Sequence, residues 1–206
     1  MLQKILKDSF WYGAGNAVSK AFIILLVPIY TRLLSKSEFG ILEILTTTSS
    51  IIIIILSLGV GSGTARYFYE AEKLNKDKIL VSTSFWFLIR FTLLILLPIL
   101  FYYKNITDIF FKNSIKSDFI LLTFCSVPFI VIYNFILIIL RLKKKVFLFL
   151  ALNLCYTFLT FFIIIFLIKK SLWGINGILV GQLISAAISW YRVTVYKRIY
   201  KVQIFV

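Results

Sequence analysis

Six long apolar runs, separated by short polar connections, constrain this chain more than any other feature of its sequence. Roughly 20 apolar helical residues are needed to cross a hydrocarbon layer of about 30 Å. Backbone polar groups in lipid must bond internally, and these runs are continuous rather than alternately apolar and polar, which favours helices over a barrel. Since 61% of the 206 residues are hydrophobic, one soluble core could not bury them all. The sequence predicts an all-α integral membrane bundle.

The expected transmembrane helices form a single domain over residues 1–206. They are residues 10–34, 41–61, 81–103, 119–140, 146–168 and 174–196. The two longest connections, residues 62–80 and 104–118, are expected to be loops that are too short to hold a soluble domain. Nothing of domain size is therefore expected outside the membrane.

The distribution of Lys and Arg predicts the orientation of the chain. Fourteen of the 23 basic residues fall at the termini or in the even-numbered connections, seven fall in the odd-numbered connections, and Lys20 and Arg90 lie inside spans. Cytoplasmic connections carry an excess of Lys and Arg. The count places both termini in the cytoplasm, in agreement with an even number of spans.

Several kinds of chemistry find no support in the sequence. The absence of His removes imidazole bases and imidazole metal ligands. Cys125 and Cys155 each lie in an apolar run and form neither a zinc spacing nor a disulfide framework. We therefore expect no metal site, no cofactor and no enzymatic activity. The net charge of +15 does not indicate a nucleic-acid partner, because most basic residues lie in short connections between spans.

Lys20 lies about ten residues into the first expected span, which is roughly 15 Å deep at 1.5 Å per residue. Tyr12, Asn16 and Lys20 follow at intervals of four residues and share one helix face. A charge at this depth is costly. The face is therefore either a water-lined surface that carries a cation, or a structural face whose lysine snorkels or pairs internally.

Arg90 holds a similar position about nine residues into the third span. Its side chain either faces a functional cavity or bonds to carbonyls of a neighbouring helix. The sixth span carries a third pattern, in which Gly177, Gly181 and Ser185 recur every four residues. Small residues at this spacing favour close helix packing. Gln182 beside them serves either as packing contact or as lining of a lumen.

The first seventy residues carry an ordered series of motifs, together with one in the sixth span. They are Tyr12-Gly-Ala-Gly-Asn16, Pro28-Ile-Tyr-Thr-Arg-Leu-Leu-Ser35, Ser37-Glu-Phe-Gly40, Ser57-Leu-Gly-Val-Gly-Ser-Gly-Thr-Ala-Arg66 and Trp173-Gly-Ile-Asn-Gly-Ile-Leu-Val-Gly-Gln182. Their order resembles the N-terminal part of the Wzx-type polysaccharide flippases, members of the multidrug/oligosaccharidyl-lipid/polysaccharide exporter superfamily. The resemblance extends over essentially the whole chain.

The resemblance implies export of a lipid-linked oligosaccharide by alternating access, for surface polysaccharide or lipopolysaccharide biosynthesis. It implies an anionic polyprenyl-diphosphate substrate among the membrane lipids, and a cavity lined by basic side chains between two six-helix lobes. Lys20, Arg90, Asn16 and Tyr12 are the expected substrate contacts. This chain would supply one lobe, so we expect a fragment, a truncated product or one half of an assembly that needs a second lobe.

Three alternatives remain open. A drug/cation antiporter of the same superfamily would need an intramembrane carboxylate, for which Glu43 is the candidate. A membrane-embedded glycosyl- or acyltransferase would need acidic or histidine chemistry in a loop, but no His and no Asp-x-Asp pattern is present. The chain could also be a structural membrane protein that transports nothing.

Overall fold

The computed structural model describes residues 2–111, 116–171 and 174–199. Over these residues the secondary structure consists of eight α-helices, without a β-strand. In chain order they are α1 (Leu2–Leu33), α2 (Lys36–Ser57), α3 (Val60–Lys73), α4 (Asp77–Phe101), α5 (Tyr103–Phe111), α6 (Ser117–Leu142), α7 (Val146–Ser171) and α8 (Gly174–Ile199). The expected all-α class is confirmed. Lys112 and Lys201, which were counted for the orientation, and Trp173, which belongs to the motif of the sixth span, lie outside the described residues.

Five segments are long and apolar enough to cross a membrane. They are Phe10–Leu33, Lys36–Lys73, Asp77–Phe101, Ser117–Leu142 and Val146–Ile168. The sixth expected span corresponds to α8, whose described apolar part, Gly174–Ser189, is shorter. The structure thus contains five to six candidate spans, at the places in the chain where the apolar runs predicted them.

The two longest connections are partly helical, which corrects the expectation that they are loops. Most of residues 62–80 belongs to α3, and residues 104–118 begin with α5. Helix α3 buries Thr64 and Phe68 but exposes Arg66 and Glu70. A short helix that buries only one narrow face has charged residues on its other faces. Its sequence therefore does not stand out as an apolar run.

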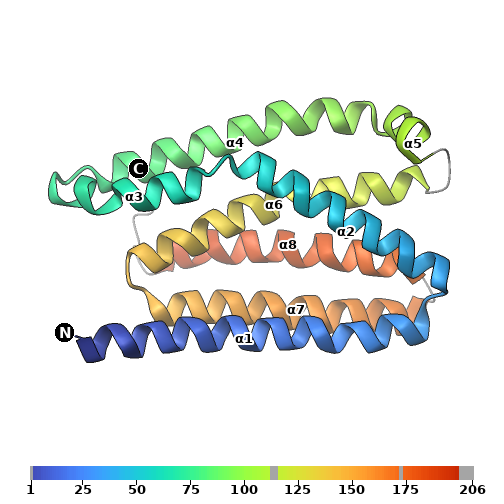
Figure 1. The fold of residues 1–206 in the computed structure, drawn as a ribbon, viewed down its shortest axis with the longest axis horizontal. Helices are drawn as coiled ribbons and strands as arrows, with labels where there is room; N and C mark the ends of the chain where they lie inside the picture. The colour runs from blue at the N-terminus through green and yellow to red at the C-terminus, as the bar shows by residue number, and fades with distance from the viewer. Residues whose placement is uncertain (1, 112–115, 172–173, 200–206) are drawn as a thin grey trace.

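The candidate span Lys36–Lys73 is interrupted at Leu58 and Gly59. These residues have φ values of 42° and 64°, in the left-handed region, which glycine adopts at no steric cost and which ends α-helices. The chain changes direction between α2 and α3 at this point (Figure 1). The segment Lys36–Lys73, with 38 residues, is therefore two helices rather than one long rod.

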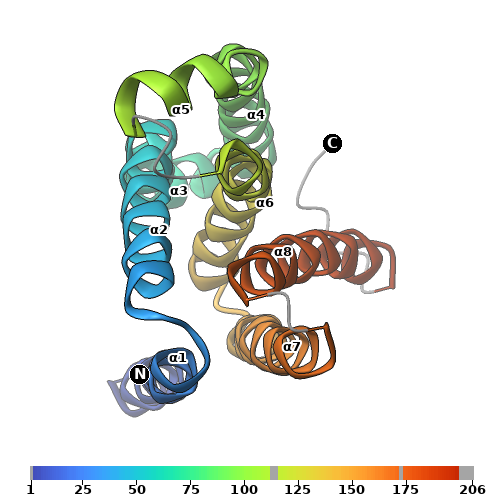
Figure 2. The ribbon, with the colours of Figure 1, turned by 90° about the vertical axis from the view of Figure 1, so that its right-hand side faces the viewer.

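Helix α2 begins at a reciprocal hydrogen-bonded cap. The backbone N–H of Ser35 donates to Glu38 Oε2 (2.9 Å), and the N–H of Glu38 donates to Ser35 Oγ (3.3 Å). This capping box satisfies two backbone donors at the start of the helix. The cap stabilises the tight turn between α1 and α2. After this turn α2 runs away from α1 (Figure 2).

Helix α6 is the centre of the bundle. Half of its most apolar stretch (50%) is buried inside the lobe, whereas the corresponding values for the other four candidate spans are 17–22%. Helices α2, α4 and α8 pack against it, and α7 packs against both α1 and α8. Helices α1 and α4 lie at opposite sides of this arrangement in both views (Figures 1 and 2).

The outer surface of the bundle is apolar. Ile24, Ile54 and Leu94, from α1, α2 and α4, are 67–71% exposed. Such a surface would be an aggregation hazard in water but suits contact with lipid or with another membrane domain.

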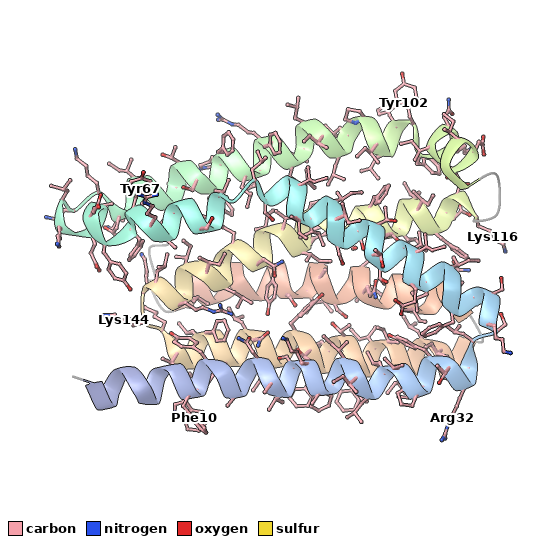
Figure 3. The ribbon with its side chains drawn as sticks, in the orientation of Figure 1. Phe10, Arg32, Tyr67, Tyr102, Lys116 and Lys144 are labelled. Carbon is pink, nitrogen blue, oxygen red and sulfur yellow. The ribbon has the colours of Figure 1, made fainter. Side chains whose placement is uncertain are left out.

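The basic connections alternate between the two ends of the bundle. The start of α1 and the α3–α4 and α6–α7 turns lie at one end, which includes Lys144 (Figures 1 and 3). Arg32 and Lys116 lie at the other end (Figure 3). The assignment of the first end to the cytoplasm stays a prediction from the Lys and Arg count.

Candidate functional site

A cavity of about 380 Å³ lies between α1, α2 and α7, with α6 and α8 at its back. Its lining residues are Phe22, Ile23, Leu26, Val27 and Tyr30 of α1; Leu42, Glu43, Thr46, Ser49, Ser50 and Ile53 of α2; Ile130 of α6; Tyr156, Thr157, Thr160, Phe161 and Ile164 of α7; and Gln182 of α8. The cavity forms because α1 and α2 separate after their turn while both remain attached to the α6–α7–α8 part of the bundle (Figure 2).

The hydroxyl groups on the α2 wall donate to their own helix. Thr46 Oγ1 donates to the carbonyl of Glu43 (3.1 Å), and Ser49 and Ser50 donate to the carbonyl of Thr46 (2.9 and 2.8 Å). A hydroxyl group has one O–H donor and two lone pairs that accept hydrogen bonds, and here the donor is already used within the helix. These side chains therefore present acceptor oxygens, rather than O–H donors, to the cavity.

The α7 wall repeats this pattern. Thr157 Oγ1 donates to the carbonyl of Asn153 (3.0 Å), and Thr160 Oγ1 donates to the carbonyl of Tyr156 (2.8 Å). Among the described residues that line the cavity, Glu43 is the one with a formal charge, and Gln182 adds an amide. The cavity is thus rich in hydrogen-bond acceptors and suits a ligand that brings donors, such as the hydroxyl groups of a sugar.

Lys20 lies on the stripe of α1 that leads to this cavity. It precedes Ile23 by one turn and Val27 by two, and both of these residues line the cavity. The Lys20 side chain is exposed, and among the described residues no carboxylate lies within the 4.0 Å of an ion pair. A cation is therefore available beside the cavity, displaced toward the N-terminal end of α1.

Tyr12 and Asn16, which share a face with Lys20, are half-buried against α7. The Tyr12 ring meets the Phe149 ring edge-on at 5.0 Å, and Asn153 Nδ2 donates to Asn16 Oδ1 at 3.3 Å. Interhelical amide hydrogen bonds of this kind hold membrane helices together. The polar face of α1 thus begins as a contact with α7 and becomes exposed at Lys20.

Arg90 lies apart from the other expected contacts. It faces a separate surface groove of about 700 Å³. The lining residues within the described part of the chain all lie on α4: Ser82, Thr83, Trp86, Phe87, Arg90, Phe91 and Leu94. Because α1 and α4 lie at opposite sides of the bundle (Figures 1 and 2), the structure does not bring Arg90 next to Lys20. Helical periodicity predicts which face a residue occupies, but not which neighbouring helix lies opposite.

The small residues of α8 are buried, and Gly181 is in close contact with α7. A Cβ on Gly181 would lie 2.8 Å from Ile164 Cγ1 and 3.4 Å from its Cα. Gly177 is buried as well, and Ser185 is fully buried with its hydroxyl donating to the carbonyl of Gly181 (2.6 Å). Gln182, next to Gly181, reaches the cavity. Here α8 supplies both a close helix contact and part of the lining.

Thr46, Ser49, Tyr156 and Thr157 line the cavity but were not among the residues that the sequence singled out as a site. Their signal is the presence of hydroxyl groups inside two strongly apolar spans. The sequence alone could not show that α2 and α7 face each other across one cavity.

The described residues thus form one lobe of candidate membrane-spanning helices around a cavity with both polar and apolar lining residues. A solved structure with this fold is described as "Outward-facing conformation of a multidrug resistance MATE family transporter of the MOP superfamily". The match has a TM-score of 0.81 at 14% identity and covers 98% of this chain but 46% of that one. The chain thus spans about half the length of that transporter.

The family model described as "Polysaccharide biosynthesis protein" matches residues 5–205. The chain therefore belongs to this polysaccharide biosynthesis family, and the resemblance noted in its motifs is confirmed. A comparison with curated proteins finds no match.

Proposed function

We propose that this chain is the N-terminal lobe of an exporter that flips a lipid-linked oligosaccharide across the bacterial cytoplasmic membrane by alternating access. The observation that supports this most is the family match over residues 5–205, in combination with a fold that covers about half of a solved transporter structure. The second lobe would come from the rest of a longer protein or from another chain.

The cavity supports a role for this lobe in substrate handling. Its acceptor oxygens suit sugar hydroxyls, and the exposed cation of Lys20 suits a lipid-linked phosphate, since charge-assisted hydrogen bonds are the strong ones. Asn16 and Tyr12 would hold α1 against α7 and so position Lys20. We retain Arg90 as a second proposed phosphate contact, reached through the α4 groove.

A specific observation favours one other function. Glu43 is a carboxylate on the wall of an acceptor-rich cavity, which is the type of site that a drug/cation antiporter needs. The solved structure of similar fold is itself described as a multidrug resistance transporter. Antiport of a cationic drug is therefore the second candidate.

Deletion of the gene in its natural host tests the first proposal. We expect loss of the surface polysaccharide and accumulation of its lipid-linked precursor in the cytoplasmic leaflet, because the sugar head group cannot cross lipid unaided. The readouts are surface polysaccharide by immunoblot and leaflet location by accessibility to a glycosidase. Normal polysaccharide together with increased sensitivity to cationic drugs would instead support the antiporter.

A further inference from the structure

Two turns that are distant in sequence come together at one end of the lobe. The α3–α4 turn has Asn75 at φ 56° and the α6–α7 turn has Lys144 at φ 54°. Asp77 Oδ2, at the start of α4, lies 3.7 Å from Lys143 Nζ. This ion pair links the two turns, which Figure 1 shows at the same end of the molecule.

Tyr69 of α3 is the centre of the resulting surface. Lys144 Nζ lies 6.0 Å from the centroid of its ring. Arg66 precedes Tyr69 by three residues and Lys73 follows it by four, so all three lie along one stripe of α3. The side chains of Arg66, Tyr69, Lys73 and Lys144 all reach the surface, and we call them the Tyr69 patch.

The cations of the Tyr69 patch are not neutralised within the lobe. Asp77 pairs with Lys143, beside the patch, and among the described residues no carboxylate lies within 4.0 Å of the cations of the patch itself. Residues 66–78 and 141–145 together contain eight basic residues and three acidic ones, namely Glu70, Glu72 and Asp77. The acidic side chains reduce the local charge without removing it.

The position of the patch suits the surface of a membrane. It lies at an end of the bundle, beside exposed apolar side chains of Leu74 and Ile79 (67% and 65% exposed). Tyrosine is enriched at membrane–water interfaces, where its ring is amphipathic. Clusters of basic residues at this level attract anionic lipid head groups.

We propose that the Tyr69 patch binds the diphosphate group of the polyprenyl lipid carrier at the membrane surface, before its head group enters the cavity. Lys144 lies beside the Tyr69 ring, Arg66 lies 5.7 Å from the centroid of the neighbouring Tyr67 ring, and Lys73 is on the same stripe of α3 as Tyr69. Three cations at this end of the lobe suit a group with two phosphates better than the single phosphate of an ordinary phospholipid. This inference rests on the proposed function, because the carrier is the substrate that function implies. In the predicted orientation the patch faces the cytoplasm, where the substrate is loaded.

Binding of farnesyl diphosphate to the whole 206-residue chain in neutral detergent tests this assignment. Thermophoresis gives the Kd, with inorganic pyrophosphate and phosphatidylglycerol as competitors. We expect Arg66→Gln and Lys144→Gln each to weaken binding by roughly 3- to 10-fold, the range for loss of one exposed charged contact. Pyrophosphate should compete, and phosphatidylglycerol should compete at least about 10-fold less well by the same reasoning.

Lys104→Gln is the matched control. Lys104 Nζ also lies 6.0 Å from a tyrosine ring, that of Tyr103, but on α5 at the other end of the lobe. The Kd of the Lys104→Gln variant for farnesyl diphosphate should stay within about twofold of that of the unaltered chain. A charge at the other end of the lobe is screened from the Tyr69 patch and contributes little to binding there. Equal loss in Lys104→Gln, no loss in the patch variants, or equal competition by phosphatidylglycerol would each overturn the assignment.

The readout separates this inference from the proposed function. If the patch binds farnesyl diphosphate as described but the host exports polysaccharide without this gene, the function is wrong and the site stands. If export depends on the gene while Arg66→Gln and Lys144→Gln bind the probe normally, the function stands and the site is wrong.

Discussion

Replacement of Lys20 by Ala, in the transporter that contains this lobe, should reduce export by roughly 10- to 100-fold. A hydrogen bond to a charged group contributes about 1.5–3 kcal/mol, and each 1.4 kcal/mol corresponds to about a factor of ten. Lys20 is exposed beside the cavity and has no carboxylate partner among the described residues. Its loss should therefore remove a substrate contact while the lobe remains folded. The measurement is surface polysaccharide per amount of transporter in the membrane.

Two control variants test whether the effect of Lys20→Ala comes from loss of the positive charge at this position. Lys20→Arg should retain most of the export, because the positive charge is kept. Arg32→Ala removes an exposed cation from the last turn of the same helix, away from the cavity lining, and should leave export within about twofold, as exposed surface charges contribute little. Full export by Lys20→Ala would show that this charge does not serve the substrate. Loss of the protein from the membrane would show that Lys20 is structural.

Replacement of Gly181 by Leu should prevent the lobe from folding. The new Cβ would lie 2.8 Å from Ile164 Cγ1, so this side chain would have to shift, and the Ile164 Cα at 3.4 Å is already in van der Waals contact. The remaining three carbons of a leucine would therefore meet α7 where the two helices already touch. Overpacking of a core costs about 1–3 kcal/mol when side chains can shift, and forced separation of α7 from α8 should cost more. Since proteins are stable by only about 5–15 kcal/mol, we expect aggregation in place of a single size-exclusion peak.

Gly13→Leu is the matched control for this substitution. Gly13 also lies in a membrane helix, but a Cβ at this position has no neighbouring atom within 4 Å. The variant should elute like the unaltered chain and unfold at a similar temperature. A normal profile for Gly181→Leu would show that α8 does not pack closely against α7 at this glycine.

The sequence was sufficient to predict the class of the fold and the approximate location of its spans. Continuous apolar runs carry this information directly, because lipid requires it. It was not sufficient for α3 and α5, since charged residues such as Arg66 and Glu70 make a helix that lies partly against the bundle look like a loop. The break at Leu58 and Gly59 separates α3 from the apolar run that precedes it.

The candidate site was predictable only in part. The depth of Lys20 marked it as unusual, and the structure places it on the stripe that leads to a cavity. The same argument from depth grouped it with Arg90, which the structure places in a groove on α4. Periodicity within one helix cannot show which helices face each other, and this also left Thr157 and Ser49 out of the expected site.

The proposed function requires that a transporter built with this lobe moves a lipid-linked oligosaccharide across a bilayer. Proteoliposomes that contain the transporter and a head-group-labelled lipid-linked oligosaccharide test it most directly, with an impermeant quencher that reports label in the outer leaflet. We expect the protected inner-leaflet label to become quenchable faster than in protein-free liposomes. With the Lys20→Ala transporter this rate should be lower than with the unaltered transporter. A quenching rate equal to that of protein-free liposomes, from transporter that elutes as a single folded species, would show that the transporter does not move this lipid.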